Sequence, residues 1–218
     1  MTRSNFETEL TALQRDILKM GTLVEQAIHD AVKALAERDL ALAEKVIRDD
    51  DIADRLHLEI ENKCLALLAL QQPMARDLRT VGTALKIVTD LERMADHAVD
   101  IAKVTLRLQG QPLIKPLIDI PRMAQATQFM VRTALTAYVE RDASKARTLA
   151  ETDHEVDHLY NQVFRELLVY MMEDPRTITQ ATYLIFVALY LERIGDHATN
   201  LGEWVVYMVT GERVDLNT

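Results

Sequence analysis

Apolar residues recur at every third or fourth position along most of the chain, which is the spacing of one buried face of an α-helix. In residues 6–36 this apolar stripe runs from Phe6 through Leu13 and Ile17 to Leu35. The further segments with the same period are residues 40–70, 76–108, 120–140, 143–172 and 177–209. Under this division all 5 prolines fall in turns or at a helix start, where a missing backbone N–H is tolerated. The pattern therefore predicts an all-α protein of six long helices.

One charged phrase stands twice in this helical pattern. LERMADHA at residues 91–98 returns as LERIGDHA at residues 191–198, with six of the eight letters unchanged. The tripeptide ERD at residues 37–39 also returns, at residues 140–142. Self-similarity at a fixed offset is typical of a repeated structural unit. The chain is therefore read as two diverged copies of one unit of about 100 residues.

Each copy contains three of the predicted helices, and short turns between them favour antiparallel packing. The expected first unit covers residues 1–110 and the second covers residues 122–218. Residues 111–121 between them hold three of the 5 prolines and are expected to form a linker. The predicted architecture is two tandem, repeated, antiparallel three-helix bundles.

Composition narrows the possible partners. The formal net charge is −9, which disfavours binding to nucleic acid and to acidic lipid. The single cysteine, Cys64, excludes an intramolecular disulfide and lies in an apolar run, so we expect a buried small side chain. The longest apolar runs are far shorter than the roughly 20 residues of a membrane-spanning helix. We expect a cytoplasmic protein.

Acidic residues four positions apart recur on the second and third predicted helices of each unit. Residues at this spacing share one helix face, and like charges there are mildly destabilising. Hard cations prefer carboxylate oxygens and would remove that cost. The sequence therefore predicts one metal site per unit. The first set is Asp50, Asp54, Glu92, Asp96 and Asp100, and the second is Asp153, Asp157, Glu192, Asp196 and Asn200.

A solvated acidic face is the alternative interpretation of these pairs. It would suit one pair, but it explains less well why the pairs stand at matching positions of both repeats. Ala95 and Gly195 lie between the acids and are small enough to let neighbouring helices approach closely. The substitution of Asn200 for an acid, and of Tyr160 for His57, predicts that the two sites are inequivalent, the second binding metal more weakly or holding fewer ions.

Four other residues of the repeated phrase are candidates for supporting roles. Arg93 and Arg193 follow the glutamates and could pair with a carboxylate across a helix interface or orient a metal ligand. His97 and His197 lie at the edge of the acidic stripe, where they would either support a ligand or face a partner.

The signatures of common enzymes are missing. The chain has no glycine-rich phosphate loop and no nucleophile elbow. Glu151-x-x-His154 and Glu155-x-x-His158 match one element of ferritin-like di-iron sites, but both lie on one predicted helix. A non-enzymatic regulator is therefore favoured, with a metalloenzyme or a ferritin-like metal-binding bundle as the alternative.

LERMADHAVDIA at residues 91–102 and LERIGDHATNLGEWVVYMVTGE at residues 191–212 resemble the paired signature of the PhoU family, and the resemblance covers essentially the whole chain. It implies a cytoplasmic homodimer that acts as a negative regulator of the phosphate-starvation response and of phosphate uptake. The implied partners are the ATPase subunit of the phosphate ABC transporter and the PAS domain of the phosphate sensor histidine kinase, with membrane association only through them. It also implies iron or zinc on the acidic pairs; manganese and magnesium are further candidates.

Overall fold

The computed structural model describes residues 3–71 and 73–217, and within them it contains helices and no strand. The helices are α1 (Arg3–Glu37), α2 (Leu40–Gln71), α3 (Arg76–Arg107), α4 (Asp119–Glu140), α5 (Ala143–Arg147), α6 (Leu149–Glu173) and α7 (Ile178–Thr210), with a 3₁₀ turn, η1 (Pro175–Thr177), before α7. The predicted all-α class is confirmed.

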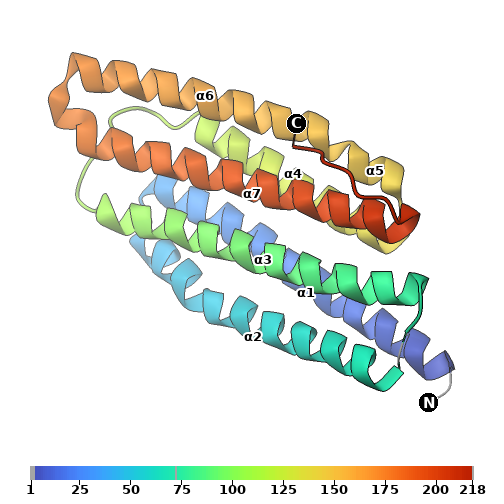
Figure 1. Ribbon diagram of the computed structural model, residues 1–218. Coiled ribbons are helices and arrows are strands. Elements are labelled where there is room, and N and C mark those ends of the chain that lie inside the picture. Colours follow the sequence, from blue (N-terminus) through green and yellow to red (C-terminus); the bar gives the residue numbers. More distant parts are fainter. Residues whose placement is uncertain (1–2, 72, 218) are drawn as a thin grey trace.

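The helices form two bundles that lie side by side along their length (Figure 1). In the first bundle α3 packs against α1 and α2, and in the second α7 packs against α4, α6 and the short α5. The bundles meet where α3 lies antiparallel to α7, and α1 also contacts α4. The two long helices that carry the repeated phrase are therefore neighbours at the centre of the molecule.

The repeated ERD tripeptide forms the turn after the first helix of each bundle. Arg38 and Arg141 adopt positive φ angles of 58° and 55°, and both follow the end of a helix. The amides of Asp39 and Asp142 each donate to the carbonyl oxygen five residues earlier at 2.9 Å, which closes the helix end. Their carboxylates then accept backbone N–H groups of the following helix at 2.9–3.0 Å.

Three helix boundaries differ from the predicted ones. The segment predicted as one helix over residues 143–172 is broken at Thr148, whose hydroxyl and amide both donate to the carbonyl of Lys145. A threonine that bonds its own backbone in this way competes with helix continuation. Helix α4 begins at Asp119, inside the segment predicted as linker, and α3 ends at Arg107, one residue before the predicted end at residue 108. Gly211, with φ 82°, caps the end of α7.

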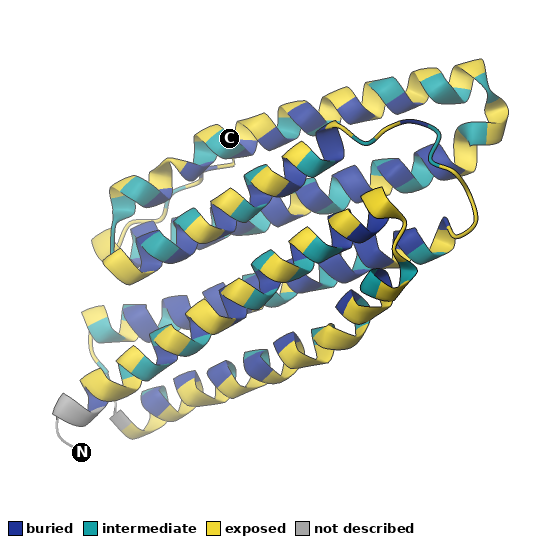
Figure 2. Cartoon of the chain, turned by 180° about the vertical axis from the view of Figure 1, so that it is seen from behind, coloured by how far each residue is buried: buried dark blue, intermediate teal, exposed yellow. Residues whose placement is uncertain are grey.

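The apolar stripes point inward and the polar faces outward on both bundles (Figure 2). Leu91, Ala98, Leu191 and Ala198 of the repeated phrase are fully buried. Cys64 is also fully buried, as its apolar surroundings in the sequence predict. In the part of the chain that the structure describes, no helix combines the length and the apolar character that crossing a bilayer requires.

Candidate metal centre: two acidic seams

The predicted ligands lie along two lines where neighbouring helices meet. The first acidic seam consists of Asp50 and Asp54 on α2 with Glu92, Asp96 and Asp100 on α3. The second acidic seam consists of Asp153 and Asp157 on α6 with Glu192, Asp196 and Asn200 on α7. Helix α2 packs on α3 and α6 packs on α7, so each predicted set comes from two helices in contact.

The repeated phrase is buried in the same way in both copies. Residues 91–100 and 191–200 have identical patterns of buried, half-buried and exposed positions. Glutamate and aspartate of each phrase are half-buried, while the residue after the glutamate is exposed. Asp153 is the most enclosed of the candidate ligands, with 5% of its surface exposed.

The carboxylates of the first acidic seam act on one another across the helix interface. Burial, followed by the charges of Asp54 and Asp96, raises the pKa of Asp50 to about 6. Burial and the charge of Asp96 likewise raise the pKa of Glu92. Lys103 pairs with Asp100 at 3.1 Å, and its positive charge lowers the pKa values of Asp50 and Asp96, against the effect of burial.

The carboxylates of the second acidic seam also repel one another, but no lysine offsets this repulsion at the position that matches Lys103, where Glu203 stands. Burial, followed by Asp196 and Asp157, raises the pKa of Glu192 to about 7. Burial and the charge of Asp157 raise the pKa of Asp153 to about 6, although the Thr199 hydroxyl lowers it.

Gly195 allows α6 and α7 to approach closely at the second acidic seam. A Cβ atom at this position would lie 3.3 Å from Oδ1 of Asp153 and 3.6 Å from a methyl carbon of Val156. The backbone of α7 therefore runs directly beside the Asp153 carboxylate, as the small residue between the acids suggests. Ala95, at the matching position of α3, is also buried.

Among the residues that the structure describes, the arginines of the repeated phrase form no ion pair across a helix interface. Arg93 lies 3.6 Å from Glu92 and 3.8 Å from Asp96, both on its own helix. Arg93 thus contacts two predicted ligands of its own helix rather than a carboxylate of another helix, and its suggested role in orienting a metal ligand stays a prediction. Arg193 is exposed in the same way, and its charge acts on Glu192 and Asp196.

The histidines lie on the side of each helix that faces the other bundle. The ring of His97 stacks on Tyr190 at 5.7 Å between centroids and lies 5.9 Å from the ring of His197. His197 Nδ1 lies 2.9 Å from the Asp90 carboxylate. Burial, followed by the neighbouring His197, lowers the pKa of His97 to about 4.

The two histidines stand at matching positions of the repeats, and so do the residues that they contact, because Tyr190 is the counterpart of Asp90. The sequence places His97 and His197 beside the acids, and the structure places them in the contact between α3 and α7. Their contacts connect the two bundles at the centre of the molecule.

Sequence reasoning missed Lys103, Thr199, Asp90 and Tyr190. Lys103 lies one turn beyond Asp100 and could have been found by extending the acidic stripe. Asp90 and Tyr190 stand seven positions before the two histidines, which is two helical turns on one face. Their contact with the histidines depends on the antiparallel packing of α3 and α7, which no single helix reveals.

The donor set of both seams suits a hard cation, because it consists of carboxylates whose mutual repulsion and burial raise their pKa values. Within residues 3–71 and 73–217, however, no three acidic, histidine or cysteine side chains already converge on one point. The residues therefore fit a metal by chemistry, and side-chain rotation would be needed to complete a ligand shell.

The fold and site define a class: a two-repeat helical protein with an acidic seam in each repeat. The PhoU domain profile matches residues 17–105 and 120–205, one match in each bundle. The chain belongs to the PhoU family.

Known relatives extend over essentially the whole chain. A phosphate-specific transport system accessory protein PhoU homolog of Clostridium acetobutylicum is 46% identical over 218 residues, covering 100% of both chains. A homolog of the same description from Rhizobium meliloti is 44% identical and covers 95% of this chain and 88% of its own.

Two solved structures share the fold. The crystal structure of PhoU from Pseudomonas aeruginosa matches with a TM-score of 0.91 at 38% identity, covering 95% of this chain and 100% of its own. The phosphate transport system regulatory protein PhoU of Streptococcus pneumoniae matches with a TM-score of 0.89 at 34% identity, covering 96% of this chain and 99% of its own.

Proposed function

We propose that this protein is a non-enzymatic, cytoplasmic negative regulator of phosphate uptake and of the phosphate-starvation response, with metal ions on its two acidic seams. The observation that carries the proposal is the matched pair of seams, whose carboxylates are held half-buried against like charges. Support for the phosphate role comes from relatives named as accessory or regulatory proteins of phosphate transport.

In the first seam Asp50, Asp54, Glu92 and Asp96 would hold the ion, with Asp100 beside them. In the second seam Asp153, Asp157, Glu192 and Asp196 would do so, with Asn200 beside them. Iron, zinc, manganese and magnesium all accept carboxylate oxygens, so the donor set leaves the metal open. A bound cation would neutralise the carboxylates and fasten α2 to α3 and α6 to α7.

The fastened helices would then present a rigid outer surface, including the exposed Arg93 and Arg193, to a partner. The expected partners are the ATPase subunit of the phosphate ABC transporter and the PAS domain of the sensor histidine kinase, and the expected assembly is a homodimer. These contacts are proposals that rest on the family membership.

The metal is tested by elemental mass spectrometry on protein purified without chelators. We compare wild type with the double variants Glu92→Gln/Asp96→Asn and Glu192→Gln/Asp196→Asn. Each variant should lose the metal of one seam. The matched control is Glu151→Gln/Glu155→Gln, which removes two exposed acids at the same spacing on α6 and should keep all the metal. A wild-type protein without metal refutes this part of the proposal.

The regulatory role is tested separately, in cells that lack the chromosomal copy. Wild type should restore repression of a phosphate-starvation reporter in phosphate-rich medium, and purified protein should retain the transporter ATPase subunit and the kinase PAS domain in pull-downs. A quadruple seam variant that loses metal but represses normally would reduce the metal to a structural role. Wild type that neither represses nor binds either partner would refute the regulatory role itself.

A further inference from the structure

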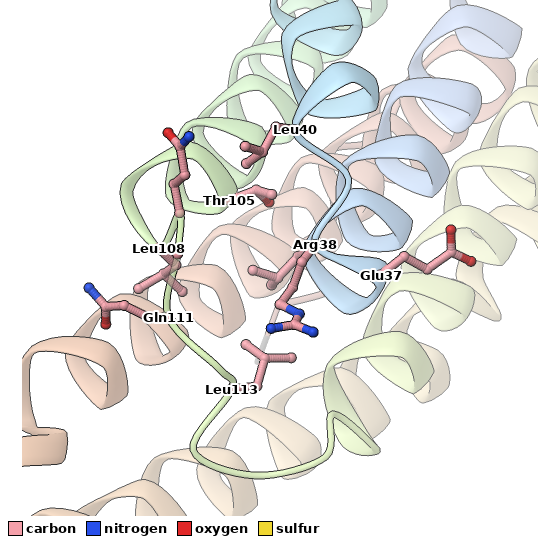
Figure 3. Close-up of a pocket in the computed structure, with 10 residues that line it drawn as sticks. Glu37, Arg38, Leu40, Thr105, Leu108, Gln111 and Leu113 are labelled. Carbon is pink, nitrogen blue, oxygen red and sulfur yellow. The ribbon is translucent and has the colours of Figure 1, made fainter.

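A pocket of about 260 Å³ opens at the end of the first bundle, where the turn between α1 and α2 meets the end of α3 and the linker (Figure 3). Leu35 and Leu40 line it from the turn, Leu108 from the end of α3, and Leu113 from the linker. The pocket lies apart from both acidic seams, and none of the predicted ligands lines it.

Arg38 supplies a positive charge to this pocket. Its φ angle of 58° places it in the left-handed region, and its guanidinium is turned toward Leu113, while the Glu37 side chain points away (Figure 3). Among the residues that the structure describes, the guanidinium has no ion pair and no hydrogen bond. Its counterpart in the second repeat, Arg141, instead donates to the Thr80 hydroxyl at 3.2 Å.

Thr105 supplies a buried hydroxyl without a partner. It lines the pocket, is 3% exposed, and its Oγ1 forms no hydrogen bond within the described part of the chain. Several other helical threonines donate to the carbonyl oxygen four residues earlier, among them Thr80, Thr89, Thr136, Thr182, Thr199 and Thr210. A buried hydroxyl left unpaired lowers stability, and rotation of the Thr105 side chain toward the pocket would bring it within reach of a bound acceptor.

The second repeat differs at the position that matches Thr105. Val205 stands at the position matching Thr105 and is fully buried, so the same shape is filled there without a hydroxyl. The C-terminal tail folds back over this end of α7 (Figure 1), and the amide of Leu216 donates to Glu203 at 2.8 Å. The hydroxyl that lines this pocket therefore has no counterpart in the second repeat.

We propose that this pocket binds a small anion that carries a phosphate group, either inorganic phosphate or a short phosphate monoester. A guanidinium offers a fork of donors that matches phosphate oxygens, and the Thr105 hydroxyl would add a third donor after its side chain rotates toward the pocket. The amides of Gln109 and Gln111 stand among the lining residues. The volume lies just below the roughly 300–1,000 Å³ typical of small-molecule sites, so the ligand has few atoms.

The test is isothermal titration calorimetry on the full chain after metal removal, with inorganic phosphate and glycerol 3-phosphate as separate probes. Thr105→Val and Arg38→Gln should each weaken binding on the order of tenfold, since each removes a charge-assisted hydrogen bond to the anion. The matched control is Arg48→Gln on the outer face of α2, which removes the same charge and should leave binding unchanged. Thr105→Val should melt no lower than wild type, because it removes an unpaired buried hydroxyl.

Tighter binding of glycerol 3-phosphate would show that the leucine walls hold an organic group, and equal binding would point to phosphate itself. The proposal is overturned if neither probe binds wild type at millimolar concentration, or if both variants bind as wild type does. Either failure leaves the proposed regulatory function and the metal experiment untouched, because those concern the acidic seams.

Discussion

Glu192 provides a direct measure of the repulsion stored in the second acidic seam. The side chain is half-buried on α7, and burial together with Asp196 and Asp157 raises its pKa from 4.5 to about 7. The ionised side chain is therefore less stable in the folded protein than in the unfolded chain. Replacing it by glutamine keeps the shape and removes the charge.

The sign of the pH dependence follows from this raised pKa. Between about pH 4.5 and pH 7 the folded state holds the proton more tightly than the unfolded state, so stability falls as the pH rises through this window. Each pKa unit corresponds to about 1.4 kcal/mol, and solvent screening of a half-buried group reduces the full effect. We expect Glu192→Gln to stabilise the metal-free protein by about 1–2 kcal/mol at about pH 8.

The assay is thermal unfolding of chelator-treated protein, where this gain corresponds to about 2–8 °C for a chain of this size. The gain should shrink at about pH 5, where the folded wild type already carries the proton. Glu151→Gln, an exposed position near the start of α6, should change neither value. A variant that is less stable than wild type at the higher pH, or a gain that is equal at both, would show that Glu192 is not held against like charges.

Five further substitutions test other parts of the structure. Gly202→Ala should destabilise by about 1–3 kcal/mol in chemical denaturation, since its Cβ would lie 2.6 Å from a side-chain carbon of α6 and 3.1 Å from a carbonyl oxygen of α5. Gly82→Ala, with no atom within 4 Å of the new Cβ, should stabilise by about 0.5–1 kcal/mol, and the opposite order would refute the packing argument. Asp142→Ala should cost about 0.5–2 kcal/mol because it removes the acceptor of two backbone N–H groups, whereas Asp39→Ala, with one such bond, should cost no more. Lys103→Gln should tighten metal binding at the first acidic seam in a chelator competition, and unchanged affinity would mean that its charge does not reach the site.

The fold was readable from the sequence because helix period and repeat are properties of the chain itself. The spacing of apolar residues predicts the long helices. The repeated phrase shows which residues of the two halves stand at matching positions. The shared face of Glu92 and Asp96 also follows from helix geometry alone. The acidic seams were predictable because α2 and α6 also carry pairs of acidic residues, and these pairs stand at matching positions of the two repeats.

The histidines show where such reasoning ends. A helical wheel gives the angle of His97 on α3 but does not say which neighbour lies at that angle. Helix α3 has three long neighbours, and the acids face α2 while His97 faces Tyr190 on α7. The break at Thr148 was missed for a related reason, because a threonine that bonds its own backbone looks, in a sequence, like any other threonine in a helix.

Several differences between the repeats lie close together in the structure. Asp100, Lys103 and Thr105 correspond to Asn200, Glu203 and Val205, all near the ends of α3 and α7. Over residues 91–100 and 191–200 both helices keep one pattern of burial, because each must pack against the other and against its own bundle. Beyond these residues their surroundings diverge, since α3 meets the α1–α2 turn and the linker, and α7 meets the C-terminal tail. The symmetric part of the repeat therefore builds the scaffold and the paired seams, and the last two turns give each bundle its own chemistry.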